Sequence, residues 1–311
     1  MNDLDLYMEK YLDHLAVMNF VPLTIRGHRY LLNRFRAYLS EMGVMEVAKV
    51  TPEILRDYQT AVSERVNLKG EPISPFTQNG NLKVVKAFFR FLVEENYLLG
   101  DPSRNLRYAR RPKVLPRGFL TKEEMRRLLK APDTGTVLGY RDRTMLELMY
   151  STGLRRAEVC NITLADVDSQ DGFLRVNRGK GRKDRVVPLG KIACRYVENY
   201  VRAVRPMLMG GKTHACLFVT DRGNPCSNFV VGNVVKLYAA KAKLEKKVTP
   251  HTLRHTCATL MMKNRAHVRH IQELLGHELL ESTQVYTQVT IVDLKEEHRK
   301  YHPREREKGT A

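Results

Sequence analysis

Two side chains that can bind an anion stand three residues apart near the start of a predicted helix. The run 249–254, Thr-Pro-His-Thr-Leu-Arg, begins with a capping threonine and a proline. Threonine is favoured at the N-cap and proline at the first helical position, so His251 and Arg254 share one face of the first turn. A helix N-terminus attracts anions, and an imidazole and a guanidinium add to that attraction. The pattern predicts a phosphate-binding site.

A second arginine, Arg155, follows a glycine in the run 152–158, Thr-Gly-Leu-Arg-Arg-Ala-Glu. The glycine indicates a turn before a helix start. Glu158 shares a helical face with Arg155 because the two are three residues apart, and we expect it to orient nearby basic groups. Taken alone, the pattern is more typical of a surface arginine pair.

A lysine lies in the most basic turn of the chain. Lys180 stands between two glycines in the run 179–184, which connects predicted strands at 173–178 and 185–189. Such a hairpin brings a lysine close to a phosphate because the flanking glycines carry no side chain. A flexible solvent loop is the alternative interpretation.

Two more residues follow a helix predicted at 267–275. His277 comes directly after Gly276, and Tyr286 lies nine residues further on, in a helix that Ser282 is able to cap. A tyrosine on an amphipathic helix is normally a packing residue, so its meaning depends on the set to which it belongs.

The elements that must position these groups fall into two regions. Residues 1–100 show apolar positions at helical spacing, with basic residues on the opposite faces. The helices predicted there cover 4–19, a segment from Thr24, a segment from Thr51-Pro52, and a segment from Ser74-Pro75 to Leu99. Basic faces of this kind suit a small bundle on a DNA backbone, or simply a solvated surface.

Residues 101–117 are rich in arginine and proline and have no apolar period, which predicts an extended basic linker. The second region, 118–311, opens with a capping box formed by Thr121 and Glu124. Beyond the hairpin it is mostly helical, with helices predicted at 141–151, 190–206, 227–243, 250–264 and 267–275. The expected fold is mainly α, a helical N-terminal bundle followed by a mostly helical domain with a small antiparallel β-sheet.

The charge balance favours a polyanionic partner. Lys and Arg number 53 against 34 Asp and Glu, which gives a net charge of +19 and a pI near 9.8. Nucleic acid is the usual polyanion for such a chain. No apolar run approaches the roughly 20 residues that span a bilayer, and the N-terminus lacks a signal peptide pattern. Five scattered cysteines without metal-ligand spacing indicate a reducing cytoplasm and no metal.

Six chemical positions, in their order and spacing, resemble the active-site set of the tyrosine recombinase (lambda-integrase-like) family. They are Arg155, Lys180, His251, Arg254, His277 and Tyr286. The surrounding phrases match as well: TGLRRAEV, GKGRKDRVVPLG, TPHTLRHTCATLM, LLGH and STQVYTQV. The resemblance covers the whole chain and is strongest to compact two-domain Xer-like or transposon-type recombinases. Arg156-Ala157 departs from the small or aliphatic pair usual in Xer proteins.

The resemblance implies site-specific recombination through a 3′-phosphotyrosyl intermediate and a Holliday junction, without cofactor or metal. It implies that Tyr286 is the nucleophile and that Lys180 protonates the departing 5′-oxygen. Arg155 and Arg254 would bind the phosphoryl oxygens. His251 would accept the tyrosine proton or bond the phosphate.

His277 would likewise bond a phosphoryl oxygen, while Glu158 would orient the basic groups. The resemblance further implies a core-binding DNA-binding domain at 1–100, the linker at 101–117 and a catalytic domain at 118–311. The segment beyond Tyr286 would dock on a neighbouring protomer, with Leu294 as its main apolar residue; a solvated tail is the alternative interpretation.

The expected partners are double-stranded DNA at specific sites, three further copies in a homo-tetramer on DNA, and an accessory or partner recombinase. Two other functions stay open: strand relaxation as by a type IB topoisomerase, and DNA binding without catalysis. The sequence does not distinguish chromosome dimer resolution from integration, excision or plasmid resolution.

Overall fold

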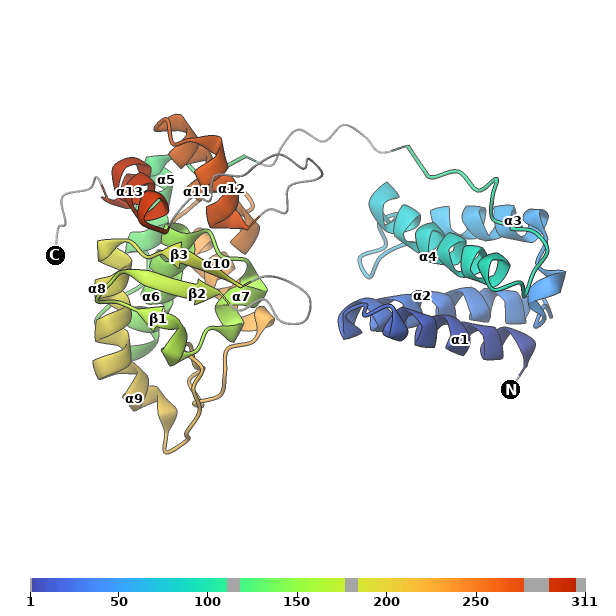
Figure 1. Cartoon of the computed structure of the whole chain (residues 1–311), viewed down its shortest axis with the longest axis horizontal. Helices are drawn as coiled ribbons and strands as arrows, with labels where there is room; N and C mark the ends of the chain where they lie inside the picture. The colour runs from blue at the N-terminus through green and yellow to red at the C-terminus, as the bar shows by residue number, and fades with distance from the viewer. Residues whose placement is uncertain (1, 111–117, 177–183, 277–290, 306–311) are drawn as a thin grey trace. The chain divides into compact units, whose positions relative to one another are not determined.

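The computed structural model describes residues 2–110, 118–176, 184–276 and 291–305. The chain divides into two compact units, Met1–Leu115 and Pro116–Ala311 (Figure 1). Each unit has its own hydrophobic core. In the part of the chain that the structure describes, none of the helices combines the length and the apolar character needed to cross a bilayer.

Unit 1 is a helical bundle around an aromatic core. Its helices are α1 (Asp3–Val17), α2 (Pro22–Glu41), α3 (Pro52–Ser63) and α4 (Pro75–Glu94), with a short 3₁₀ turn at Val47–Lys49. Phe35 and Tyr58 pack edge to face with ring centroids 4.8 Å apart, a favourable geometry for aromatic pairs. Each helix buries its apolar stripe between its neighbours, as the sequence period predicts.

The ends of these helices test the predicted caps. Thr51 and Ser74 cap α3 and α4 as predicted. The prediction for Thr24 was wrong, because Pro22 occupies the first turn of α2 and Val21 precedes it. Helix α4 also ends before the predicted Leu99, since Asn96 takes a left-handed conformation with φ of 60° and reverses the chain.

The packed part of unit 1 extends to Ala109, nine residues further than the sequence boundary at 100. The side chain of Asn79 pairs with the backbone of Ala109 in both directions, at 2.9 and 2.7 Å. Leu106 is buried in the core, and Lys86 donates to its carbonyl oxygen. These contacts satisfy backbone groups that an extended linker would leave to water.

Unit 2 is built around α6 (Val137–Thr152), which is buried along most of its length. The other helices are α5 (Lys122–Lys130), α7 (Arg156–Asn161), α8 (Lys191–Asn199), α9 (Arg205–Met209), α10 (Asn228–Lys241), α11 (Pro250–Lys263), α12 (Val268–Leu275) and α13 (Ile291–Tyr301). The segment predicted as one helix at 190–206 is divided between α8 and α9 by a π-helical turn at Tyr200–Val204. The capping box of Thr121 and Glu124 is present at the start of α5.

The predicted hairpin forms the main part of a small antiparallel sheet. Strand β2 (Phe173–Val176) pairs with β3 (Arg185–Pro188), and a two-residue strand β1 (Val167–Asp168) pairs with β2. Val176 faces Arg185 in the last pair of the ladder, while Lys180 of the predicted turn lies outside the described residues. The fold is therefore mainly α with a small antiparallel sheet, as predicted.

The C-terminal segment packs on its own unit, where α13 lies beside β3 (Figure 1). Leu294 is only 5% exposed and belongs to the core of unit 2. His298 and His302 are buried, and their Nε2–H groups donate to the carbonyl oxygens of Ser151 and Tyr150 at 2.7 and 3.1 Å. Leu294 is thus neither solvated nor open to a neighbour in this arrangement, and docking in a tetramer stays a prediction.

Candidate active site

Four of the predicted site residues lie in the described part of the chain, and they come from two elements. Arg155 and Glu158 stand at the start of α7, and His251 and Arg254 stand at the start of α11. Lys180, His277 and Tyr286 lie outside the described residues.

The turn before Arg155 depends on glycine. Gly153 ends α6 with φ of 62°, a left-handed conformation that a side chain disfavours. A Cβ atom there would stand 2.7 Å from Cδ2 of Leu275. The close approach brings the α6–α7 turn against the end of α12, and Arg155 becomes the N-cap residue of α7.

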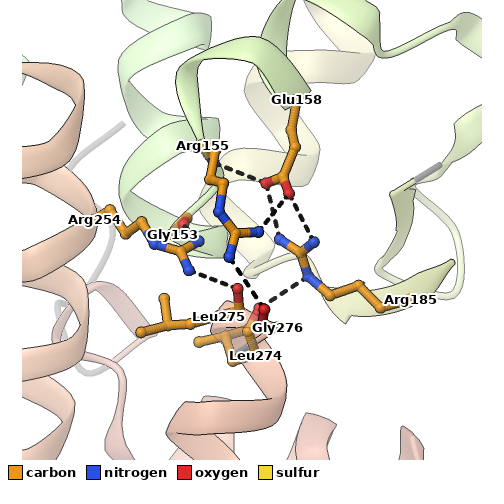
Figure 2. Close-up of polar contacts among 8 residues, drawn as sticks. All are labelled: Gly153, Arg155, Glu158, Arg185, Arg254, Leu274, Leu275 and Gly276. Atoms are coloured by element: carbon orange, nitrogen blue, oxygen red, sulfur yellow. Dashed lines mark hydrogen bonds and ion pairs between the residues drawn. The ribbon is translucent and has the colours of Figure 1, made fainter. Parts of the chain in front are cut away.

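Glu158 holds two arginines (Figure 2). Its Oε1 accepts from Nη1 of Arg155 at 2.9 Å and from Nη1 of Arg185 at 2.8 Å. Its Oε2 accepts from Nη2 of Arg185 at 2.9 Å and from the backbone N–H of Arg155 at 2.8 Å. Burial raises the pKa of Glu158, but these hydrogen bonds and charges outweigh it and bring the pKa to about 2. The carboxylate is ionised at neutral pH.

Arg185 is a site residue that the sequence reasoning missed. It is the first residue of β3 and follows the basic run 179–184. The local sequence therefore does not distinguish it from the other basic residues of that run. Only the fold brings it to Glu158, which is 27 positions away in the chain. Its side chain is 11% exposed, which separates it from a solvated surface arginine.

Three guanidinium groups also converge on the end of α12, as Figure 2 shows. Nη2 of Arg254 donates to the Leu275 carbonyl at 2.6 Å, and Nη2 of Arg155 donates to the Gly276 carbonyl at 3.1 Å. Nε of Arg185 donates to the Leu274 carbonyl at 3.3 Å. The C-terminal carbonyls of a helix carry partial negative charge, so this end of α12 attracts and orients cations.

Arg254 is the most buried of the three guanidinium groups. Its other terminal nitrogen, Nη1, donates to the Gly153 carbonyl at 2.7 Å, which ties α11 to the α6–α7 turn. Burial, and then the nearby charge of Arg155, lowers the pKa of Arg254 to about 10. The group is still protonated at neutral pH. Three guanidinium charges against the one carboxylate of Glu158 leave this cluster with a net charge of +2, from three minus one.

His251 is exposed and stands at the wall of a cavity of about 540 Å³. Thr249 caps α11 and Pro250 occupies its first position, as the sequence predicts. The charged and titratable side chains that line the cavity are all basic: Arg156, Lys236, Lys246, Lys247 and His251. Arg254 is buried against the carbonyls of Gly153 and Leu275, whereas His251 is exposed at this cavity. The structure therefore separates the two residues that were expected to share one face.

The arrangement has the chemistry of a phosphate site. The Arg155 side chain is 34% exposed, while Arg254 and Arg185 are mostly buried behind it. Planar guanidinium groups donate paired hydrogen bonds to phosphoryl oxygens. Within the described ranges, no three His, Cys, Asp or Glu side chains form a group able to hold a metal ion.

Comparisons with known proteins identify the family of this chain. A model of the phage integrase family matches residues 118–291, more than half of the chain. Tyrosine recombinase XerC 2 of Ralstonia nicotianae is 39% identical over 297 residues, covering 96% of this chain and 85% of the relative. Tyrosine recombinase XerD of Staphylococcus aureus (strain Mu50) is 32% identical over 298 residues, covering 96% of this chain and 98% of the relative.

Two solved structures share the fold. The Tn1549 transposon integrase in complex with a circular intermediate DNA matches with a TM-score of 0.70 and 20% identity, covering 89% of this chain and 92% of that one. A lambda integrase dimer bound to a COC′ core site matches with a TM-score of 0.67 and 18% identity, covering 93% and 100%. This chain therefore belongs to the phage integrase family, and it is a site-specific tyrosine recombinase of the Xer-like type.

Proposed function

We propose that this recombinase opens one DNA strand at a time with the hydroxyl of Tyr286 and holds it as a 3′-phosphotyrosyl intermediate. The observation that carries the proposal is the meeting of Arg155 and Arg254 at the end of α12. These arginines come from elements about 100 residues apart, and α12 directly precedes His277 and the segment with Tyr286.

Each predicted residue then has a chemical task. The Tyr286 oxygen forms a bond to phosphorus while the bond between phosphorus and the 5′-oxygen breaks. The tyrosine proton passes to His251, and Lys180 donates a proton to the departing oxygen. A free 5′-hydroxyl of another strand reverses the step, so the bond energy is kept and ATP is not needed.

Charge stabilisation is the task of the two arginines. In-line attack concentrates negative charge on the non-bridging oxygens, and donors fixed beforehand stabilise that charge without reorganising. Arg155 and Arg254 are fixed in this way by Glu158 and by the carbonyls of Gly153 and α12. We assign His277 to a further hydrogen bond with a phosphoryl oxygen.

The rest of the DNA contact is assigned to the basic surfaces. The cavity beside His251 suits phosphates that flank the cleavage point, because its charged lining is basic. We assign unit 1 as the core-binding domain, since α2 presents an exposed basic face that includes Arg26, Arg34 and Arg36. Strand exchange between two duplexes takes four protomers, so we propose a homo-tetramer on DNA, with an accessory or partner recombinase, in the cytoplasm.

A suicide DNA substrate tests the proposal. The duplex carries the sequences that flank the gene for this chain, with a nick placed so that the 5′-hydroxyl fragment diffuses away and religation is blocked. We expect a covalent protein–DNA band on a denaturing gel, present with the parent chain and with Tyr301→Phe but absent with Tyr286→Phe. Tyr301 is the matched control because it is another tyrosine of unit 2, in α13, to which the proposal gives no chemical task.

The same assay separates the other two functions. A band together with relaxed plasmid and no recombinant product would indicate topoisomerase-like strand relaxation. Retarded mobility on a native gel, without a band on any substrate of a site panel, would indicate DNA binding without catalysis. An unchanged band with Tyr286→Phe would remove Tyr286 from the mechanism.

A further inference from the structure

We propose that Arg185 is a positioning residue for recombination: it holds Glu158, and through Glu158 it keeps Arg155 in place for the scissile phosphate. The inference rests on the proposed function, in which Arg155 binds that phosphate. Arg185 itself need not touch the DNA, because its side chain is 11% exposed and all the contacts described for it point inward.

One guanidinium joins three parts of the site. Nη1 and Nη2 of Arg185 bond the two oxygens of Glu158 at 2.8 and 2.9 Å, which fixes the plane of the carboxylate. Nε bonds the Leu274 carbonyl in the last turn of α12. The neighbouring carbonyls of Leu275 and Gly276 are those that hold Arg254 and Arg155. Arg185 therefore ties β3 to the start of α7 and to the helix end on which both phosphate-binding arginines rest.

The charge of Arg185 matters as much as its geometry. Glu158 is an ionised carboxylate in contact with Arg155, and it competes with a phosphate for that cation. With Arg185 present, the carboxylate shares its charge between two arginines, and the cluster has a net charge of +2. Without Arg185 the net charge of the cluster falls to +1, and Arg155 is the only guanidinium among these groups still bonded to Glu158. We therefore expect that loss of Arg185 weakens the binding of phosphate by Arg155, although Arg155 itself is unchanged.

The shape of the side chain explains why arginine suits this position. A lysine would keep the positive charge, but its ammonium group cannot bond both oxygens of Glu158 in the planar fork and reach the Leu274 carbonyl as well. Arg185→Lys therefore separates charge from geometry, and Arg185→Gln removes both.

The molecule contains a matched control for a purely structural role. Glu147 in α6 also lies between two arginines, with Oε1 accepting from Nη2 of Arg143 at 2.8 Å and from Nη2 of Arg304 at 2.7 Å. The Arg143 side chain is 10% exposed, close to the value for Arg185. Arg143→Gln thus removes the same kind of buried ion pair from the same unit, away from Arg155.

The test measures single-turnover cleavage of the suicide substrate at saturating DNA, in variants shown by thermal melting to be folded. We expect Arg185→Gln to slow cleavage about 10- to 100-fold, less than the ~100- to 1000-fold expected for Arg155→Gln, a direct donor. Arg185→Lys should recover part of the rate. Arg143→Gln should stay within about 3-fold of the parent rate, and the double variant Arg155→Gln/Arg185→Gln within about 3-fold of Arg155→Gln alone.

A second substrate distinguishes a positioning role from a purely structural one, because a structural defect leaves the rate ratio of parent to variant unchanged from one substrate to the other. A methylphosphonate at the cleavage point replaces one charged non-bridging oxygen with a methyl group and leaves less charge for Arg155 to neutralise. The rate ratio of parent to Arg185→Gln should therefore shrink by about 10-fold on this substrate, as it should for Arg155→Gln. A defect of folding would leave the ratio the same on both substrates.

The outcomes separate the inference from the function on which it rests. If Arg155→Gln cleaves at the parental rate, the phosphate-binding role that the proposed function gives to Arg155 fails. Two results would overturn only the role of Arg185, provided that Arg155→Gln is slow. In the first, the rate losses of the two single variants multiply in the double variant. In the second, the rate ratio of parent to Arg185→Gln is the same on the phosphodiester and methylphosphonate substrates. If Arg185→Gln does not fold, the same cleavage rates are measured with Arg185→Lys, which keeps the positive charge.

Discussion

Two clusters of the same composition, each a glutamate between two arginines, lie in unit 2 and differ in the exposure of their arginines. Glu147 is fully buried, and its partners Arg143 and Arg304 are 10% and 16% exposed. Glu158 has Arg185 on its inner side, but its other partner, Arg155, is 34% exposed. One cluster joins the C-terminal segment to α6, and the other presents a guanidinium to the surface.

The difference lies in where the charge goes. In the Glu147 cluster both arginines donate to acceptors of the protein: Arg143 and Arg304 bond Glu147, and Arg143 also donates to the Leu129 carbonyl. In the Glu158 cluster the helix end and the carboxylate orient Arg155 while part of its side chain stays accessible. The two clusters therefore differ in the exposure of a single member, and the proposed phosphate-binding role belongs to that member, Arg155.

The sharpest test of this comparison is the exposed member itself. We expect Arg155→Gln to reduce single-turnover cleavage by about 100- to 1000-fold, because it removes a fixed donor to the transition-state charge. The melting temperature should change little, since the side chain is partly solvated. Cleavage kinetics beside a thermal melt check both parts, and a large loss of stability would place Arg155 with the structural arginines.

The inverse result is expected for the buried cluster. Glu147→Gln leaves two arginines around a neutral group in the interior, and breaking such a buried pair costs about 3–5 kcal/mol. Cleavage per folded molecule should be close to the parent value at low temperature. Denaturant unfolding with cleavage at 10 °C measures both quantities. A slow but fully stable variant would contradict the structural assignment.

The segment that Arg304 anchors should also be sensitive to acid. Burial lowers the pKa of His298 from 6.5 to about 4, and burial with the neighbouring His298 lowers the pKa of His302 well below its ordinary value. A histidine whose folded pKa lies below its unfolded value stabilises the fold above pH 6.5 and loses that contribution as the pH falls toward 4. We expect a loss on the order of 1–3 kcal/mol over this range, measured by denaturant unfolding.

Substitution identifies the source of that acid sensitivity. Between pH 6.5 and 4, the free energy of unfolding of His298→Gln should change less steeply with pH than that of the parent, because one titrating group is gone. An unchanged slope would assign the effect to other groups. Amide exchange in α13 reports whether the C-terminal segment loosens first.

The smallest expected effect concerns Glu158. Its pKa of about 2 lies below the ordinary 4.5, so its contribution to stability is complete above pH 4.5 and declines as the pH falls toward 2. The difference in melting temperature between the parent and Glu158→Gln should therefore be constant from pH 7 to 5 and narrow below 4.5. A difference that already narrows between pH 7 and 5 would show that the arginines do not hold the carboxylate as the geometry indicates.

The predictions from sequence held where the forces are local. The caps at Thr51, Ser74 and Thr121 depend on hydrogen bonds across three residues, and each is present. The hairpin strands and the glycine stop of α6 are local in the same sense. Local rules also misplaced two helix ends, at Thr24 and Leu99, because Pro22 and Asn96 offered competing signals close by.

Taken by itself, the sequence determined the fold class, the basic character and the set of residues that resembles a recombinase site, since these follow from composition, short-range hydrogen bonds and motif order. Only the tertiary structure decided that Arg185 holds Glu158, that the end of α12 orients Arg155 and Arg254, and that Leu294 belongs to its own core. The pair of Arg155 and Glu158, three positions apart, is local, but the other contacts that orient these arginines join residues 21 to 121 positions apart. No periodicity or spacing rule reaches that far, because such contacts exist only after the cores have packed.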